Sequence, residues 1–167
     1  MNCNRIISTL FLVAFGILLS SCSMIRGYCA DGLNGPGVAL INIDSRKHRA
    51  AHAFGGITCT LKDLAKIGRL YLNNGMWDGK RIVSEEWIHL TTDFNPKSSY
   101  HYSWYDVRFE GFKTGQYPGF YAIGICNQVL YVNPHKRLIM VRIGEDNIGW
   151  ATIPEVFEQL SNVWPSE

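Results

Sequence analysis

The sequence predicts an α+β domain, in which an antiparallel sheet is flanked by helices. Three apolar runs, Phe120 to Ile125, Val129 to Asn133 and Leu138 to Ile143, follow one another with short turns between them. Two segments that begin near Leu61 and Thr152 carry apolar residues at helical spacing. No internal repeat occurs, and 167 residues fit a single domain at most.

The first part of this domain is predicted to hold a short strand and a capped helix. The apolar run Val38 to Ile43 is typical of a strand. A helix is predicted over Leu61 to Tyr71, because Thr60 and Asp63 have the spacing of a capping box at its start. Asn73 to Gly75 ends it, since these residue types readily adopt the left-handed conformation.

The middle of the chain alternates between turns and short elements. Asp78-Gly79 is a turn signal, and Ser84 is predicted to cap a short helix that ends near Thr91. The aromatic, alternating stretch Tyr100 to Val107 predicts one strand. Phe109 to Gly119 is rich in glycine and predicts a loop.

The turns and the helix at the C-terminal end complete the prediction. Cys126-Asn127 is expected to join the first two of the three strands, because Asn tolerates the positive φ that a tight hairpin needs. Pro134 to Arg137 is expected to join the second pair. A final helix is predicted from Thr152 to about Val163. Its expected apolar face consists of Val156, Phe157, Leu160 and Val163.

The first residues predict a lipoprotein signal peptide. Arg5 supplies a positive charge, and Ile6 to Leu19 form an apolar run that ends at a small-residue pair before Cys22. As a helix the run reaches only about 21 Å, which is short of the roughly 30 Å hydrocarbon core. We therefore expect cleavage before Cys22 and lipid attachment to its thiol. An ordinary signal peptide and an uncleaved anchor remain alternatives.

This prediction divides the chain into three parts. Residues 1–21 are the signal peptide, 22–37 a linker rich in turn formers, and 38–167 the folded domain. A lipid on Cys22 would hold the protein on a membrane of the bacterial cell envelope rather than through it.

The composition excludes several classes of partner. A net charge of +2 with scattered Lys and Arg does not indicate nucleic-acid binding. The five His are dispersed and no C-x-x-C pair occurs, so neither a metal site nor a cofactor is expected. Cleavage before Cys22 would leave Cys29, Cys59 and Cys126 besides the lipidated residue. An odd number of thiols implies no disulfide framework, and Cys59 and Cys126 are interpreted as packing residues.

Four segments carry a resemblance to a known family. They are Ala39 to Ser45, Ala53 to Trp87, Tyr100 to Trp104 and Phe120 to Gly144. In order and spacing they resemble the serine β-lactamase-like hydrolases, which include class C β-lactamases, penicillin-binding-protein relatives, esterases and amide hydrolases. The similarity covers Val38 to Trp164, corresponds to the C-terminal portion of the family only, and is best with its esterase and amide-hydrolase branch. It implies the rear part of a β-lactamase/transpeptidase-like fold.

The resemblance also implies acyl transfer, but the nucleophile is missing from this sequence. In the family, a serine in S-x-x-K attacks the carbonyl of a small acyl substrate, and the lysine one helical turn away takes its proton. No serine here has lysine three residues later; Ser23 comes nearest, with Arg26, and arginine cannot act as a base near neutral pH. No catalytic residue is therefore assigned.

The family's third motif has two candidates in this sequence. Lys113-Thr114-Gly115 matches K-T-G literally, but it leaves too many residues before Pro134 for one compact hairpin. Ala122 to Ile125 fits the strand better, so Ala122, Gly124 and Ile125 are the favoured equivalents. By resemblance, the Ile125 backbone N–H corresponds to an oxyanion-hole donor, and Gly124 lets a substrate carbonyl approach. Alternatively, both residues merely serve the hairpin.

One further string match is interpreted as structural. Tyr71-Leu72-Asn73 matches the family's Y-x-N, but Tyr71 belongs to the apolar stripe of the predicted helix, which favours core packing.

Two hypotheses of function follow. The chain is a truncated hydrolase relative that is inactive by itself, or it is a non-catalytic, lipid-anchored binding module or a gene remnant. In either case a partner chain could supply the missing half. Without that half, the apolar face of the Leu61 to Tyr71 helix and one sheet edge are expected to be exposed.

Overall fold

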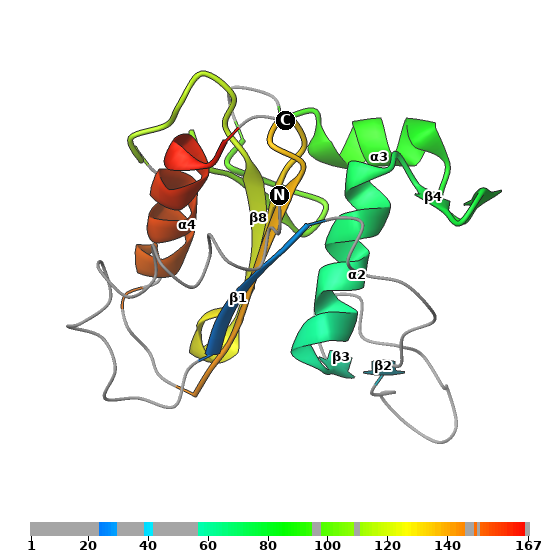
Figure 1. Ribbon diagram of the computed structural model, residues 1–167, viewed down its shortest axis with the longest axis horizontal. Helices are drawn as coiled ribbons and strands as arrows, with labels where there is room; N and C mark the ends of the chain where they lie inside the picture. The colour runs from blue at the N-terminus through cyan, green and yellow to red at the C-terminus, as the bar shows by residue number, and fades with distance from the viewer. Residues whose placement is uncertain are drawn as a thin grey trace.

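The computed structural model describes residues 24–29, 39–41, 57–94, 98–108, 111–145, 149 and 151–165, and within them it confirms the α+β class. The main antiparallel sheet has the strand order β1-β10-β9-β8-β7-β6. Helix α4 (Thr152–Val163) lies on one side of this sheet, and α2 (Leu61–Leu72) and α3 (Glu85–Thr92) lie on the other (Figure 1). The strands are β1 (Met24–Cys29), β6 (Tyr100–His101), β7 (Trp104–Asp106), β8 (Phe120–Gly124), β9 (Gln128–Asn133) and β10 (Leu138–Ile143).

The alternation of side chains along the strands divides the core into two clusters. In β9, Leu130 and Val132 join the cluster on the α2 side, whereas Val129 and Tyr131 join the cluster on the α4 side. The other strands alternate in the same way because successive side chains of a strand point to opposite faces. Both faces of the central strands are covered, which explains why these strands read as continuous apolar runs.

Helix α2 forms as the sequence predicts. The Thr60 hydroxyl accepts a hydrogen bond from the Asp63 backbone N–H at 3.1 Å and donates one to the Asp63 carboxylate at 2.8 Å. At the other end, Asn74 and Gly75 have φ values of 49° and 81°, so the chain leaves the helix through the left-handed conformation.

The apolar face of α2 packs on the sheet, next to the buried Leu130 and Ile139. The expectation that this face is exposed is therefore wrong, although its members keep some solvent exposure. These partly buried residues are Leu61, Leu64, Ile67 and Tyr71.

The segment after α2 also follows the prediction. Asp78 and Gly79, both with positive φ, form the turn of a small hairpin between β4 (Met76–Trp77) and β5 (Lys80–Arg81). Ser84 caps α3, and its hydroxyl accepts a hydrogen bond from the Trp87 backbone N–H at 3.1 Å.

The single strand predicted over Tyr100 to Val107 is wrong. The chain reverses at Tyr102 and Ser103, which have φ values of 45° and 72°, so that β6 and β7 pair with each other. The alternating aromatic pattern does not reveal this turn, because Tyr102 is typical of strands and Ser103 favours turns only weakly.

The three C-terminal strands and the turns between them are confirmed, with one difference. β8 ends at Gly124, and Ile125 begins a short 3₁₀ turn, Ile125–Asn127, that leads into β9. Cys126 and Asn127 in this turn have φ values of 59° and 56°, as expected for a tight hairpin.

Helix α4 has the predicted ends, and its predicted face is confirmed in part, since Leu160 packs against the core beside Phe157. Phe157 is buried, whereas Val163 is exposed and the polar side chains of Glu158 and Ser161 are buried instead. Polar side chains of the sheet provide their partners, as described below.

The N-terminal half of the chain is described only in part. β1 pairs along its whole length with β10, so Met24–Cys29, inside the predicted linker 22–37, form a strand of the main sheet. The division of the chain into three parts stays a prediction. β2 (Ala39–Ile41) pairs with β3 (Ile57–Cys59), which confirms a strand within Val38 to Ile43. The predicted signal peptide 1–21 and the lipid-attachment residue Cys22 lie outside the described residues.

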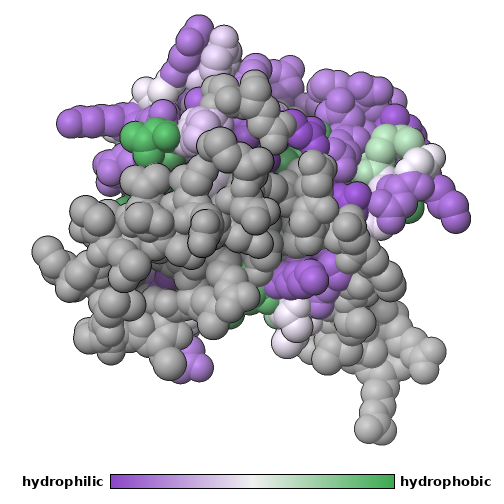
Figure 2. Space-filling view, in the orientation of Figure 1, coloured by the Kyte–Doolittle hydropathy of each residue, from purple (hydrophilic) through white to green (hydrophobic). Residues whose placement is uncertain are grey.

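The described surface is mostly polar on the side shown in Figure 2, where hydrophobic areas are small and separate from one another. Within the described part of the chain, no helix combines the length and the apolar character needed to cross a bilayer.

Candidate functional site

The far end of β8 is an open sheet edge. β9 pairs with β8 from Phe120 to Gly124, whereas β7 pairs with it only at Phe120 and Tyr121. Among the described strands, the stretch from Ala122 to Gly124 therefore has a neighbour on one side only. An open edge presents backbone N–H and C=O groups that can pair with another extended molecule.

The predicted third-motif residues follow one another along this edge. Ala122 is partly buried and packs against the core on the α2 side, and Gly124 is partly buried at the end of the strand. Ile125 is 85% exposed at the start of the 3₁₀ turn. The three residues thus lie where an extended ligand could approach, although none of them can act as an acid, base or nucleophile.

Gly124 is not required by the hairpin itself. Its φ of −122° is open to any residue, and a Cβ at this position would meet only the Gln128 Cβ, at 3.7 Å. The absence of a side chain here leaves space above the strand end. This geometry favours the interpretation that something approaches Gly124 over the interpretation that the residue only serves the turn.

A buried arginine holds the turn that follows. Arg142 on β10 is fully buried, and its Nη1 donates hydrogen bonds to the carbonyl oxygens of Cys126 at 3.1 Å and Asn127 at 2.7 Å. Both carbonyls belong to the residues with left-handed backbone conformation, so the guanidinium satisfies acceptors that the hairpin ladder cannot.

Gln128 and Gly144 lie next to Arg142 and help to hold the turn in place. The Gln128 side-chain amide donates to the Gly144 carbonyl and accepts from the Gly144 N–H at 3.0 Å. A Cβ at Gly144 would come within 2.5 Å of Arg142 Nη2, so only glycine leaves room for the guanidinium. We call Arg142, Gln128 and Gly144 the turn clasp.

Sequence reasoning missed the turn clasp. Its one signal is that Arg142 is the only charged residue in the otherwise apolar strand Leu138–Ile143. A charge in a strand that is buried on both faces needs specific partners.

The literal K-T-G string lies elsewhere in the fold. Lys113 to Gly115 belongs to the loop before β8, as the sequence predicts, and α4 holds this loop. Glu158 accepts hydrogen bonds from the backbone N–H groups of Gly115 at 3.3 Å and Gly119 at 3.2 Å, and Asn162 donates to the Lys113 carbonyl at 3.2 Å.

Glu158 belongs to a buried polar cluster on the α4 face. The Tyr131 hydroxyl donates to Glu158 at 2.7 Å, and Asn133 donates to Ser161 Oγ at 2.8 Å. Burial, together with the charge of Glu158, raises the pKa of Tyr131 far above its usual range, so Tyr131 stays protonated and acts as a structural donor. We call Glu158, Tyr131, Asn133 and Ser161 the polar cluster.

The other sequence matches to catalytic patterns are structural. Tyr71 packs against Trp104 with ring centroids 4.6 Å apart, which confirms its place in the core. Within the described residues, no group of three or more His, Cys, Asp or Glu side chains is arranged to hold a metal ion.

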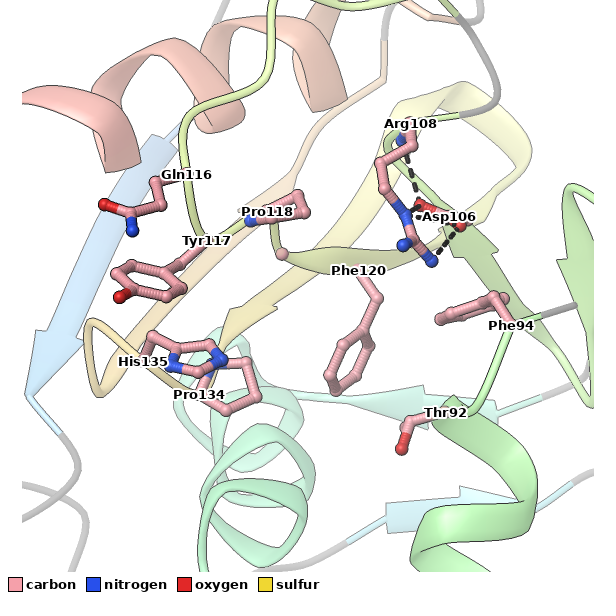
Figure 3. A pocket seen from close by; sticks show the side chains of 11 residues that line it. Thr92, Phe94, Asp106, Arg108, Gln116, Tyr117, Pro118, Phe120, Pro134 and His135 are labelled. Atoms are coloured by element: carbon pink, nitrogen blue, oxygen red, sulfur yellow. Dashed lines mark hydrogen bonds and ion pairs between the residues drawn. The ribbon is translucent and has the colours of Figure 1, made fainter. Parts of the chain in front are cut away.

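A separate pocket of about 300 Å³ lies near the start of β8 (Figure 3). Tyr117 and His135 stack on one side of it, and Arg108, held by Asp106 through contacts of 2.7 to 2.9 Å, lies on the other. The hydrogen bonds that Arg108 donates to Asp106 raise the pKa of Arg108, and the charges of Asp106 and Asp93 act in the same direction. Because the Asp106 carboxylate pairs with the Arg108 guanidinium, the charges select no class of ligand for this pocket.

Comparison with known proteins gives one clear relationship. A curated 6-aminohexanoate-dimer hydrolase from Paenarthrobacter ureafaciens is 30% identical over 119 residues, which is 63% of this chain and 28% of that enzyme. A Bacillus anthracis protein described as a 6-aminohexanoate-dimer hydrolase has a similar structure, with a TM-score of 0.50 at 22% identity. That match also covers 63% of this chain and 28% of the other. Over part of its length, this chain is therefore similar to serine β-lactamase-like hydrolases.

The resemblance predicted from the sequence is thereby confirmed for part of the chain. A structure from Bacteroides dorei that is described as a β-lactamase superposes with a TM-score of 0.49 at 14% identity. The match covers 72% of this chain and 45% of the other. No profile of a known protein family matches the sequence. The chain spans 28% of the length of both hydrolases, so their whole activity does not transfer to it directly.

Proposed function

We propose that this polypeptide supplies the sheet-edge side of an acyl-transfer site, the side that binds the carbonyl oxygen, and that it catalyses no hydrolysis by itself. The observation that carries the proposal is the open end of β8, which leads through Gly124 to the exposed Ile125 at the start of a fixed turn.

The chemistry of acyl transfer explains why such an edge is useful. Attack on a carbonyl places negative charge on its oxygen, and backbone N–H groups that point at this oxygen lower the barrier by several kcal/mol. The Ile125 N–H is our candidate donor. The space above Gly124 supports the proposal, because a carbonyl must come close to the backbone to accept a hydrogen bond from it.

The substrate class follows from the named relative. Its name gives the dimer of 6-aminohexanoate, a linear amide, as its substrate. We propose small amides, and more broadly esters and lactams, as the acyl compounds that the complete site accepts. The nucleophile must come from outside these 167 residues, because no serine among them is followed by lysine three positions later.

The claim of inactivity can be tested directly. We expect no covalent labelling when the purified 167-residue chain is incubated with a fluorophosphonate probe, and no hydrolysis of a chromogenic lactam. An active serine hydrolase in the same buffer is the control. Labelling of any serine in this chain would overturn the claim.

The role of the Ile125 N–H needs an assay in which a nucleophile is present. The chain can be combined with the part of the Paenarthrobacter ureafaciens enzyme that it does not match. The change Ile125→Pro removes this N–H, and the extended conformation of Gly124 (φ −122°, ψ −178°) suits a residue before proline. Ile125→Val keeps the N–H and serves as the matched control.

We expect the reconstituted pair to hydrolyse the amide dimer, and we expect Ile125→Pro to lower kcat about 100-fold or more. Ile125→Val should remain within about threefold of the parent, because its backbone donor is intact. An active pair that is insensitive to Ile125→Pro would remove Ile125 from the oxyanion site.

We also propose that a lipid on Cys22 holds the mature protein at a membrane of the bacterial cell envelope. The apolar run followed by Leu19-Ser20-Ser21-Cys22 supports this proposal. Cys22→Ala should abolish incorporation of labelled palmitate during expression in a bacterial host. Unchanged incorporation would contradict it. A lipid-anchored, non-catalytic binding module is the second candidate function, and a failure of every reconstitution would favour it.

A further inference from the structure

We infer that Arg142 is a positioning residue for the acyl-transfer site: it fixes the Ile125–Asn127 turn so that the Ile125 N–H keeps one direction. This inference rests on the proposed function, and it adds a residue that lies two strands away from the edge and touches no substrate.

Arg142 contacts the two left-handed residues of the turn. A two-residue left-handed turn directs its carbonyl groups away from the hairpin ladder, and such groups need another donor when they are not in water. Arg142 Nη1 reaches both carbonyls, at 3.1 Å and 2.7 Å, from the adjacent strand of the β9–β10 pair. A single rigid donor thus fixes two consecutive peptide groups, those that follow Cys126 and Asn127.

Gly144 leaves the space that the Arg142 guanidinium occupies. Arg142 is fully buried, and Gly144 lies so close that a Cβ there would collide with Nη2, Cζ and Nη1 at 2.5 to 2.8 Å. The Gln128 amide then fixes the Gly144 backbone through two hydrogen bonds. A planar group held in this way cannot rotate, so the turn has few alternative conformations.

The positive charge of Arg142 lies beside the same turn. A buried guanidinium beside the turn is a fixed positive charge in a region of low dielectric, where electrostatic effects are stronger than in water. Negative charge that develops on a carbonyl oxygen at the Ile125 N–H would be stabilised by it. Lysine keeps the charge but cannot replace the planar, two-carbonyl geometry, so Arg142→Lys separates positioning from charge.

The test uses the full chain and measures backbone order by NMR relaxation. In the wild type we expect order parameters near about 0.85 for Ile125 to Asn127, as for rigid backbone, and values below about 0.6 in Arg142→Lys and in Gly144→Ala. Arg137→Lys is the matched control, because Arg137 is an exposed arginine on the β9–β10 turn. It should leave the Ile125–Asn127 values unchanged.

A mobile turn in the wild type would overturn the inference, and this measurement needs no variant to fold. Unchanged order in a folded Arg142→Lys variant would overturn it as well.

Kinetics of the reconstituted pair provide the second readout. Arg142→Lys should lower kcat about tenfold while KM stays within about threefold, because a misdirected donor affects the transition state more than substrate binding. If Ile125→Pro has no effect on an active pair, the proposed function fails, whereas the NMR result still reports on Arg142. If Ile125→Pro inactivates the pair but Arg142→Lys leaves kcat unchanged, only the positioning inference fails.

Discussion

The two faces of the main sheet are held by different interactions. On the α2 face the buried side chains of the central strands are apolar, with Val132, Ile139 and Val141 at its centre. On the α4 face, Val129 and Phe157 share the core with the polar cluster of Glu158, Tyr131, Asn133 and Ser161. Burial of apolar area depends little on direction, whereas each hydrogen bond of the polar cluster depends on one particular partner.

This difference explains what each face does. The α2 face attaches a helix to the sheet mainly by burial of apolar side chains. The α4 face attaches both a helix and the irregular loop before β8, since Glu158 accepts the backbone N–H groups of Gly115 and Gly119. A loop without secondary structure offers few apolar side chains, so hydrogen bonds must hold it. We therefore expect changes of similar size to have unequal effects on the two faces.

The largest effect is expected for Glu158→Ala. The change leaves the Tyr131 hydroxyl and two backbone N–H groups without their acceptor in the interior. We expect a loss of about 3 kcal/mol in the free energy of unfolding, measured by urea denaturation. Gln159→Ala, at the adjacent exposed position, is the control and should change stability by less than about 0.5 kcal/mol. Equal effects of the two changes would mean that Glu158 contributes no more to the free energy of unfolding than an exposed residue does.

Tyr131→Phe removes one hydroxyl at nearly constant volume. The Glu158 carboxylate then loses the hydrogen bond that the Tyr131 hydroxyl donates. We expect the free energy of unfolding to fall by about 1.5 kcal/mol, again measured by urea denaturation. A cost near zero would show that the backbone N–H groups of the loop satisfy Glu158 alone.

The raised pKa of the Tyr131 hydroxyl predicts that the free energy of unfolding depends on pH. The pKa of Tyr131 is raised in the folded state, so the folded protein keeps this proton at a pH where the unfolded chain, with a pKa near 10, has released it. The contribution of Tyr131 to stability is therefore full below pH 10 and is lost as pH rises above that value. Between pH 9 and 11, the stability of the wild type should fall relative to Tyr131→Phe by up to about 1.4 kcal/mol. A difference that stays constant over this range would contradict the raised pKa.

Ile139→Val is the matched change on the α2 face and is expected to have the smallest effect. It removes one methylene from a fully buried side chain, at a cost of about 1 kcal/mol. Its effect should not depend on pH between 9 and 11. If Ile139→Val costs clearly more than Tyr131→Phe, the proposed contrast between the two faces is wrong.

Much of the fold could be predicted because its signals are local. The capping box at Thr60 and Asp63 and the left-handed pair Cys126-Asn127 act within a few residues, and both are observed as predicted. The prediction failed at Tyr102-Ser103, where an alternating aromatic stretch turns back on itself. Nothing in the local pattern distinguishes one long strand from two short ones. Pairing with β8 at Tyr105 and Asp106 accompanies the reversal.

In the candidate site, too, local sequence patterns did not reveal contacts between residues that are far apart in the chain. The sequence indicated Ala122, Gly124 and Ile125 through a family resemblance, and the assignment of Ile125 as an oxyanion donor stays a prediction. Arg142 and Glu158 gave no comparable signal, because their partners lie 15 or more residues away along the chain.

By itself the sequence determined the helices, the central strands and most turns, since periodicity, capping and backbone preference are properties of neighbouring residues. Only the tertiary structure decided that β8 has an open end, that α4 buries a carboxylate, and that an arginine on β10 fixes the turn after Gly124. Those features depend on which distant groups meet in the interior, where a polar group is stable only when its partner is in place.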